Sequence, residues 1–228
     1  MTATVHSHPA LGSTAIGITL AGGVLVMLLR DVGPLDPLAV FVGGLAVFGA
    51  STSIRRRGHR LLGSPGRLIG LCMMIAPVWL YVRAGVPEFV LLIAGLGVIS
   101  VAVLSIGLLP VNGPGSRLLV KTGTGGLFAA VLVAAIGDVP DLSILIAGVG
   151  TILTWDAGEH AINVGEQLGT EAGTAPIELT HVTASAGVGA GALVLVFALG
   201  RLAPGDLSLV QFVGIIGAVV LLTLALHE

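Results

Sequence analysis

Residues 88–109 read EFVLLIAGLGVISVAVLSIGLL, an apolar run whose only charged residue is the first. A helix needs about 20 such residues to cross the roughly 30 Å of hydrocarbon in a bilayer. Because hydrocarbon offers no partner for backbone amides, only helices and closed barrels can span it. Barrel strands alternate apolar and polar residues, whereas Phe89–Ile99 is apolar at every position. The run therefore predicts a membrane-spanning helix.

The rest of the chain has the same character. Of its 228 residues, 55% are hydrophobic and 10% are charged, with a mean hydropathy of +1.06. Soluble domains carry roughly 25% charged residues, so this chain cannot cover a water-facing surface. We predict an all-α fold, a polytopic transmembrane helix bundle of about eight spans that forms a single transmembrane domain over residues 1–228. The expected spans are residues 12–29, 35–53, 68–86, 88–109, 118–137, 140–154, 179–199 and 207–226.

Basic residues predict the orientation in the cell membrane. The loop between the second and third spans contains Arg55, Arg56, Arg57, Arg60 and Arg67. Loops rich in arginine and lysine stay in the cytoplasm. With eight spans, both termini are then cytoplasmic as well. The same cluster could also attract anionic lipid headgroups.

Prolines test the expected span boundaries. Nearly all of them lie at or near a span end, including Pro65 just before the third span. Only Pro77 lies deep in a span, where it removes a backbone hydrogen bond and predicts a kink.

Four turns on the outer side of the membrane resemble one another. Each combines a proline with an acidic residue, and a glycine follows about seven residues later, as Gly44, Gly95, Gly148 and Gly214. This pattern indicates four repeated helical hairpins, and repeat interfaces often hold the sites of transporters. Convergence is the alternative, since a proline and an acid are common turn residues and glycine is common in membrane helices. The turns are residues 33–37, 85–88, 138–141 and 204–206.

Residues 155–178 form a polar insert between the sixth and seventh spans. Ala157, Ala161, Val164 and Leu168 recur at helical spacing and would share one face. The insert is predicted to be a short amphipathic helix on the cytoplasmic surface or a cytoplasmic extension of the sixth span.

The opposite face of this insert carries Asp156, Glu159, His160, Asn163 and Glu166. We interpret these residues as a candidate docking surface for a membrane or cytoplasmic protein partner. A solvated polar face is the simpler interpretation. A metal or acid–base cluster, with a second imidazole from His181, is a third, but the spacing is not the His-Glu-x-x-His of metalloproteases. No metal, catalytic or cofactor-binding residue is therefore assigned.

Small residues in the seventh span suggest close helix packing. Thr183, Gly187 and Gly191 recur every four residues, which lets a neighbouring helix approach. We expect these residues to pack against another helix rather than bind a ligand.

Several function classes lack a signal. The net charge of −2 gives no basic field for nucleic acid. Lys121 precedes a glycine-rich stretch, but no glycine stands before it as a phosphate loop requires. The spans also lack the buried ionisable residues that coupled transporters and membrane proteases use. We therefore expect a protein that is not an enzyme and needs no cofactor.

The run Trp155–Gly169, followed by Glu178-Leu179-Thr180-His181, resembles an uncharacterised family of haloarchaeal multi-pass membrane proteins. The resemblance is specific over about residues 155–190. It implies an archaeal cell membrane. It also implies genes that often lie near those of MoxR-type ATPases, and hence an accessory part of a membrane assembly.

The leading functional hypothesis is a non-enzymatic scaffold in the lipid bilayer whose polar insert docks a protein partner. A small-solute channel or transporter formed between the helical hairpins is the alternative.

Overall fold

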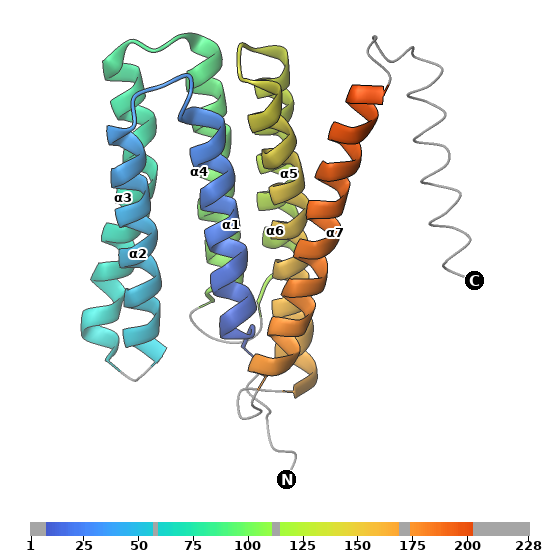
Figure 1. The fold of residues 1–228 in the computed structure, drawn as a ribbon. Coiled ribbons are helices and arrows are strands. Elements are labelled where there is room, and N and C mark those ends of the chain that lie inside the picture. Colours follow the sequence, from blue (N-terminus) through green and yellow to red (C-terminus); the bar gives the residue numbers. More distant parts are fainter. Residues whose placement is uncertain (1–7, 57–58, 111–114, 169–173, 203–228) are drawn as a thin grey trace. The chain divides into compact units, whose positions relative to one another are not determined.

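The computed structural model describes residues 8–56, 59–110, 115–168 and 174–202. Within these ranges the chain forms seven α-helices and no strand (Figure 1). The chain divides into two compact units, residues 1–190 and 191–228, and the second is described only over the end of the last helix. The helices are α1 (Leu11–Leu29), α2 (Asp36–Arg56), α3 (Arg60–Ala84), α4 (Glu88–Leu108), α5 (Arg117–Ile136), α6 (Asp141–Leu168) and α7 (Ala175–Leu202).

Six of these helices, all except α6, are long and apolar enough to cross a membrane. Their outward faces carry large exposed hydrophobic side chains, among them Leu68, Trp79 and Ile136, as expected where the solvent is lipid. The prediction of an all-helical, membrane-embedded protein is therefore confirmed at this level. The eighth predicted span, residues 207–226, lies outside the described residues.

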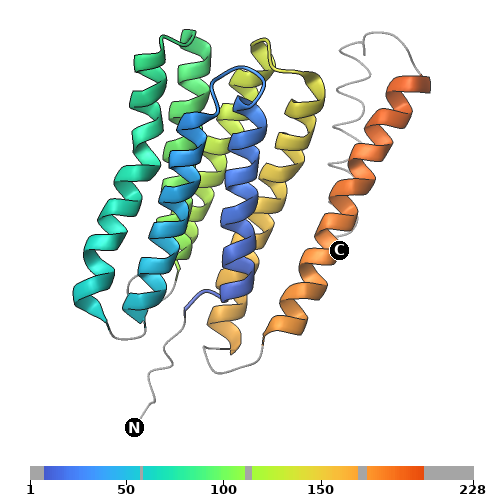
Figure 2. The ribbon, with the colours of Figure 1, turned by 60° about the vertical axis from the view of Figure 1, so that its left-hand side comes forward.

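The connections α1–α2, α3–α4 and α5–α6 all lie at one end of the bundle, as both ribbon views show (Figures 1 and 2). We call this the turn end, and the opposite end, where α6 finishes, the polar end. At the turn end, α3 stops at Gly85, whose φ of 64° is the left-handed conformation that glycine adopts without strain. Its amide donates to the carbonyl of Val82.

Two predicted boundaries need correction. The third span was expected to begin at residue 68, but α3 begins at Arg60, so Pro65 lies inside the helix with Pro77. Pro65 has no N–H to donate to the carbonyl of Leu61, so one backbone hydrogen bond near the start of α3 is absent. The sixth span and residues 155–168 of the polar insert form one continuous helix of 28 residues, which matches the extension alternative for that part of the insert, and residues 175–178 begin α7.

Helix pairing differs from the expected outer hairpins. The closest packing joins α2 with α3, α4 with α5 and α1 with α6. A Cβ at Gly44 would lie 2.6 Å from the backbone nitrogen of Met74 in α3, whereas a Cβ at Gly95 or Gly148 would meet no described atom within 4 Å. These glycines occupy equivalent places in the predicted repeat but do not share a packing role, so the repeated hairpins are not confirmed.

The core lies between the helices rather than in a separate layer. Leu25 and Leu28 of α1 and Val98 and Leu104 of α4 are fully or almost fully buried. The apolar window of α4 is 56% buried, the highest value among the six apolar helices. The core thus fixes α1 and α4 and positions the helix ends that form the polar end.

Candidate functional site

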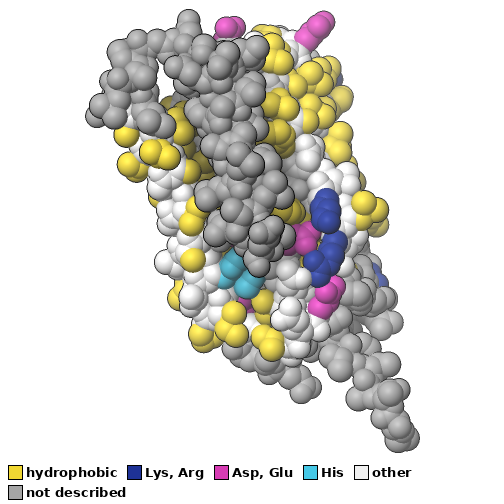
Figure 3. Space-filling view, turned by 90° about the vertical axis from the view of Figure 1, so that its right-hand side faces the viewer, with side chains coloured by type: hydrophobic (Ala, Val, Ile, Leu, Met, Phe, Trp, Pro, Cys, Tyr) yellow, Lys and Arg dark blue, Asp and Glu magenta, His cyan; other side chains and the backbone are white. Residues whose placement is uncertain are grey.

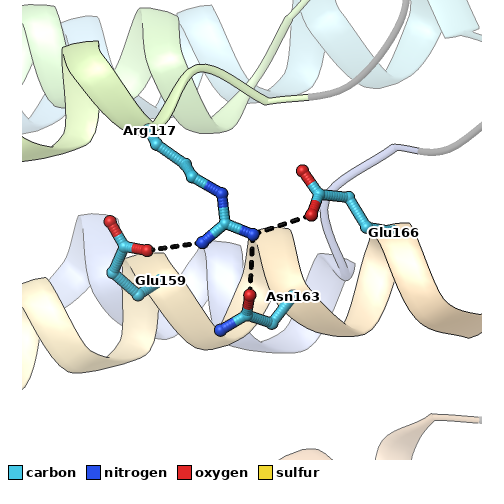
Figure 4. Close-up of polar contacts among 4 residues, drawn as sticks. All are labelled: Arg117, Glu159, Asn163 and Glu166. Carbon is cyan, nitrogen blue, oxygen red and sulfur yellow. Dashed lines mark hydrogen bonds and ion pairs between the residues drawn. The ribbon is translucent and has the colours of Figure 1, made fainter.

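Two clusters of polar side chains flank α6 at the polar end. The Arg117 cluster consists of Arg117, Glu159, Asn163 and Glu166 (Figure 4). The histidine cluster consists of Asp156, His160, His181 and Ser185. The α6 residues of both clusters lie at or beyond Trp155, in the half of the helix that the sequence marks as polar.

Arg117 binds three side chains of α6 at once. Its Nη1 donates to Oε2 of Glu159 at 2.8 Å, and its Nη2 donates to Oδ1 of Asn163 and to Oε2 of Glu166, both at 2.7 Å. Positions 159, 163 and 166 lie on one helix face because they are four and three residues apart. The planar guanidinium suits this arrangement, since it offers several donors in a fixed fork.

The position of Arg117 explains why two carboxylates are needed. Arg117 is the first residue of α5, and Ser116 caps that helix by accepting a hydrogen bond from the amide of Leu119. A cation at a helix N-terminus faces the positive end of the helix dipole, which is unfavourable. Glu159 and Glu166 offset that charge and tie α5 to the end of α6.

The histidine cluster joins α6 to α7. The rings of His160 and His181 are stacked, with centroids 3.8 Å apart and planes 6° apart. Nε2 of His181 lies 2.9 Å from Oδ2 of Asp156, and Ser185 donates to the same oxygen at 2.6 Å. The Nε2 atoms of both histidines are buried and form no hydrogen bond with the described residues. The His181–Asp156 contact therefore lacks hydrogen-bond alignment, and it is an ion pair only when His181 is protonated.

Glu178 of α7 caps the N-terminus of α1. Its carboxylate accepts from the backbone amide and the hydroxyl of Ser13, and from the hydroxyl of Thr174 at 2.5 Å. Ala10 provides no side-chain cap for α1, so Glu178 supplies the anion that a helix N-terminus favours. Gly12 leaves room for this carboxylate, because a Cβ there would lie 2.7 Å from Oε2 of Glu178.

The segment before α1 also packs on α6. The amide of Ala10 donates to the carbonyl of Ala161 at 2.8 Å. Gly165 allows the backbone of His8 and Pro9 to lie against the helix, since a Cβ at that position would collide with the carbonyl of His8. The end of α6 is therefore held from three directions, by α5, by α7 and by the N-terminal segment.

The geometry limits the chemistry of this site. In a nucleophilic triad the histidine lies between the serine and the aspartate. Here Asp156 lies between Ser185 and His181 and contacts both, so these three residues are not arranged as a triad. Within the described ranges, no group of three or more His, Cys, Asp or Glu side chains could hold a metal ion. The arrangement can exchange protons and hold helices together.

A shallow cleft of about 80 Å³ borders the histidine cluster. Asp156 and Ser185 are its polar residues, and the remaining lining is apolar. Figure 3 shows histidine side chains on this face near acidic and basic ones, with hydrophobic side chains elsewhere. The lining residues are Ile16, Leu20, Leu153, Asp156, Ala157, Val182, Ser185 and Ala186.

The five candidate docking residues thus divide between the two clusters. Glu159, Asn163 and Glu166 face α5, while Asp156 and His160 face α7. The nearness of His181 to this face was among the sequence interpretations, whereas the role of Arg117 was missed. The only sequence signal for Arg117 was its positive charge near a predicted span end, and such a charge is also expected for a residue that merely sets the orientation in the membrane.

On α7, close packing against another helix is seen at Gly189, next to the predicted stripe of small residues. A Cβ at Gly189 would lie 2.9 Å from Val149 of α6, whereas a Cβ at Gly187 or Gly191 would meet no described atom within 4 Å. Close packing through Thr183, Gly187 and Gly191 stays a prediction.

These features define a class: an all-helical, membrane-embedded protein with a polar end built around one long helix. The chain belongs to a family of unknown function, DUF7519, which matches residues 64–223. No curated protein and no solved structure matches the chain.

Proposed function

We propose that the protein is a non-enzymatic membrane scaffold, an accessory subunit of a membrane assembly, that offers the end of α6 to a protein partner. The observation that carries this proposal is the length of α6, 28 residues without a break. Such a helix is about 42 Å long, at about 1.5 Å per residue. It exceeds the roughly 30 Å of hydrocarbon, so about 12 Å projects into the aqueous phase.

Where α5 and α7 both span, α6 between them crosses the bilayer as well. Its neighbours α5 and α7 are both long and apolar enough to span. The α5–α6 connection lies at the turn end, and α6 finishes at the polar end (Figure 1). With about 12 Å outside the hydrocarbon, the part that projects is roughly the last eight residues of α6, at the polar end.

Contacts on three sides hold this projection in place. The Arg117 cluster fixes one face, the histidine cluster a second, and the N-terminal segment lies along Gly165. Rigid surfaces bind partners with less loss of conformational entropy. Glu166, Gln167 and Leu168 remain exposed at the tip and offer one acid, one amide and one apolar side chain.

Site-specific photocrosslinking tests the docking proposal. A photoreactive residue in place of Gln167, in native membranes, should give an adduct with one other protein. The matched control replaces Glu88, which is exposed at the turn end, and should not give that adduct. The same adduct from both positions, or none from Gln167, would contradict the proposal. An archaeal source and an ATPase partner stay predictions from the resemblance.

The cleft beside α1, α6 and α7 favours a second candidate, a path for small solutes. Its lining is apolar apart from Asp156 and Ser185, so an uncharged solute would fit better than an ion. Flux into liposomes that contain the purified protein tests this candidate. Substitution of Ala186 by a larger residue should slow the flux, and liposomes that are no more permeable than protein-free ones would reject the candidate.

A further inference from the structure

Few contacts hold α7 against the rest of its unit. Of residues 175–190 of α7, the part that belongs to this unit, only Glu178 and Gly189 are buried. Glu178 binds the start of α1, His181 and Ser185 meet Asp156, and Gly189 lies against α6. Most of these contacts are polar, so their charge state decides how firmly the first half of α7 is held.

The stacked imidazoles are the centre of this attachment. His160 belongs to α6 and His181 to α7, and their centroids lie 3.8 Å apart. Both Nε2 atoms are buried without a hydrogen bond from the described residues. A buried imidazole nitrogen without a hydrogen bond is costly. Nε2 of His181 has only the nearby carboxylate of Asp156, and imidazole nitrogens take up a proton near neutral pH.

The charges that face the pair come from two helices. On α6 the facing charge is Asp156, and on α7 it is Glu178. The helix α1 contributes Ser13, which Glu178 already binds. On α5, Arg117 is bound to Glu159 and Glu166 on another face of α6. The N-terminal segment that packs on Gly165 adds one further titratable group, His8, which interacts with other groups.

We propose that His160 and His181 form a proton-operated latch between α6 and α7. While at most one of the two rings is protonated, the rings remain stacked. A second proton, on His160, places two cations face to face and releases the first turns of α7 from α6. The latch acts within the chain and does not require the proposed partner.

The stacked geometry opposes the second of the two protonation steps. Two positively charged rings with centroids 3.8 Å apart repel each other, so His160 binds its proton less readily while the rings are stacked. The released state binds this proton at the usual histidine pKa of about 6.5. The latched state binds it only at lower pH, so the latch is fully stable above about pH 6.5 and weakens as pH falls below it.

Pulsed electron spin resonance on the full chain in lipid nanodiscs tests the latch. Spin labels replace Gln167 at the end of α6 and Thr180 on α7, both exposed, in a Cys72→Ser background. We expect one narrow distance distribution above about pH 6.5, and a longer, broader one as pH falls below that value. A distribution that stays unchanged over this range would overturn the proposal.

Variants at His160 separate the latch from other pH effects. His160→Gln should keep the narrow distribution at every pH, and His59→Gln, an exposed control between α2 and α3, should respond as the parent does. Should His160→Gln fail to fold, His160→Phe keeps a stacked ring without a titrating nitrogen and should also abolish the response. A pH response that persists in the folded His160 variant would overturn the proposal.

Discussion

The interface between α4 and α5 and the interface between α6 and α7 are built in opposite ways. Between α4 and α5 the helices approach because side chains are absent: a Cβ at Gly123 would lie 2.8 Å from the backbone nitrogen of Leu104 and from the carbonyl oxygen of Ser100. Between α6 and α7 the contact depends on side chains that are present, namely His160, His181 and Asp156.

This difference indicates which parts of the molecule respond to changes in pH and salt concentration. In lipid, glycine interfaces are stabilised by van der Waals contact, which pH and salt hardly change. Imidazoles and carboxylates respond to both. The bundle core is therefore expected to be constant, and the first half of α7 is the part whose attachment can vary.

The largest expected effect comes from filling the glycine interface. Gly123→Val should destabilise the protein by about 1–3 kcal/mol, because the backbone of α4 cannot move aside easily. Gly125 lies two residues away, and a Cβ there would meet no described atom. Gly125→Val should change stability by less than about 1 kcal/mol. Unfolding by denaturing detergent measures both, and equal losses would contradict the proposed packing of α4 on α5.

A smaller effect is expected at the cap of α1. Glu178→Ala removes the acceptor for the amide and hydroxyl of Ser13 and should cost about 1–2 kcal/mol, as the loss of other helix caps does. Glu178→Gln retains one side-chain oxygen and should recover part of that loss. The same unfolding assay compares them, and an alanine variant as stable as the parent would show that Glu178 does not stabilise α1.

The smallest effect is expected at Arg117, which is partly exposed and therefore screened by salt. Arg117→Ala leaves Glu159 and Glu166 without their cation and should lower stability mainly at low ionic strength. Lys121→Ala removes an exposed charge from the next turn of α5 and is the matched control. Unfolding curves at low and high salt distinguish the two variants. The same salt dependence in both would indicate a general charge effect rather than the Arg117 cluster.

The helices themselves were predictable, but their neighbours were not. Apolar runs of about 20 residues identify spans because membrane thickness sets their length. Pairing depends on local shape, and Gly44 and Gly95 show this, since similar sequence contexts place one against α3 and the other against no described atom.

The site was predictable in part. The polar positions Asp156, Glu159 and Glu166 follow from helical spacing, but their division between a face toward α5 and a face toward α7 does not. The partner of the last two, Arg117, is more than forty residues earlier in the chain and was assigned only a topological role. A single sequence contains no signal for such a distant pair, because either charge is equally consistent with exposure to water.

The central claim is that polar side chains hold the first half of α7 to α6. Asp156 tests it most directly, because it contacts both His181 and Ser185. Hydrogen exchange of Asp156→Ala in nanodiscs, compared with the parent, should show faster exchange in residues 175–186 and no change in residues 117–124. Unchanged exchange in residues 175–186 would contradict the claim.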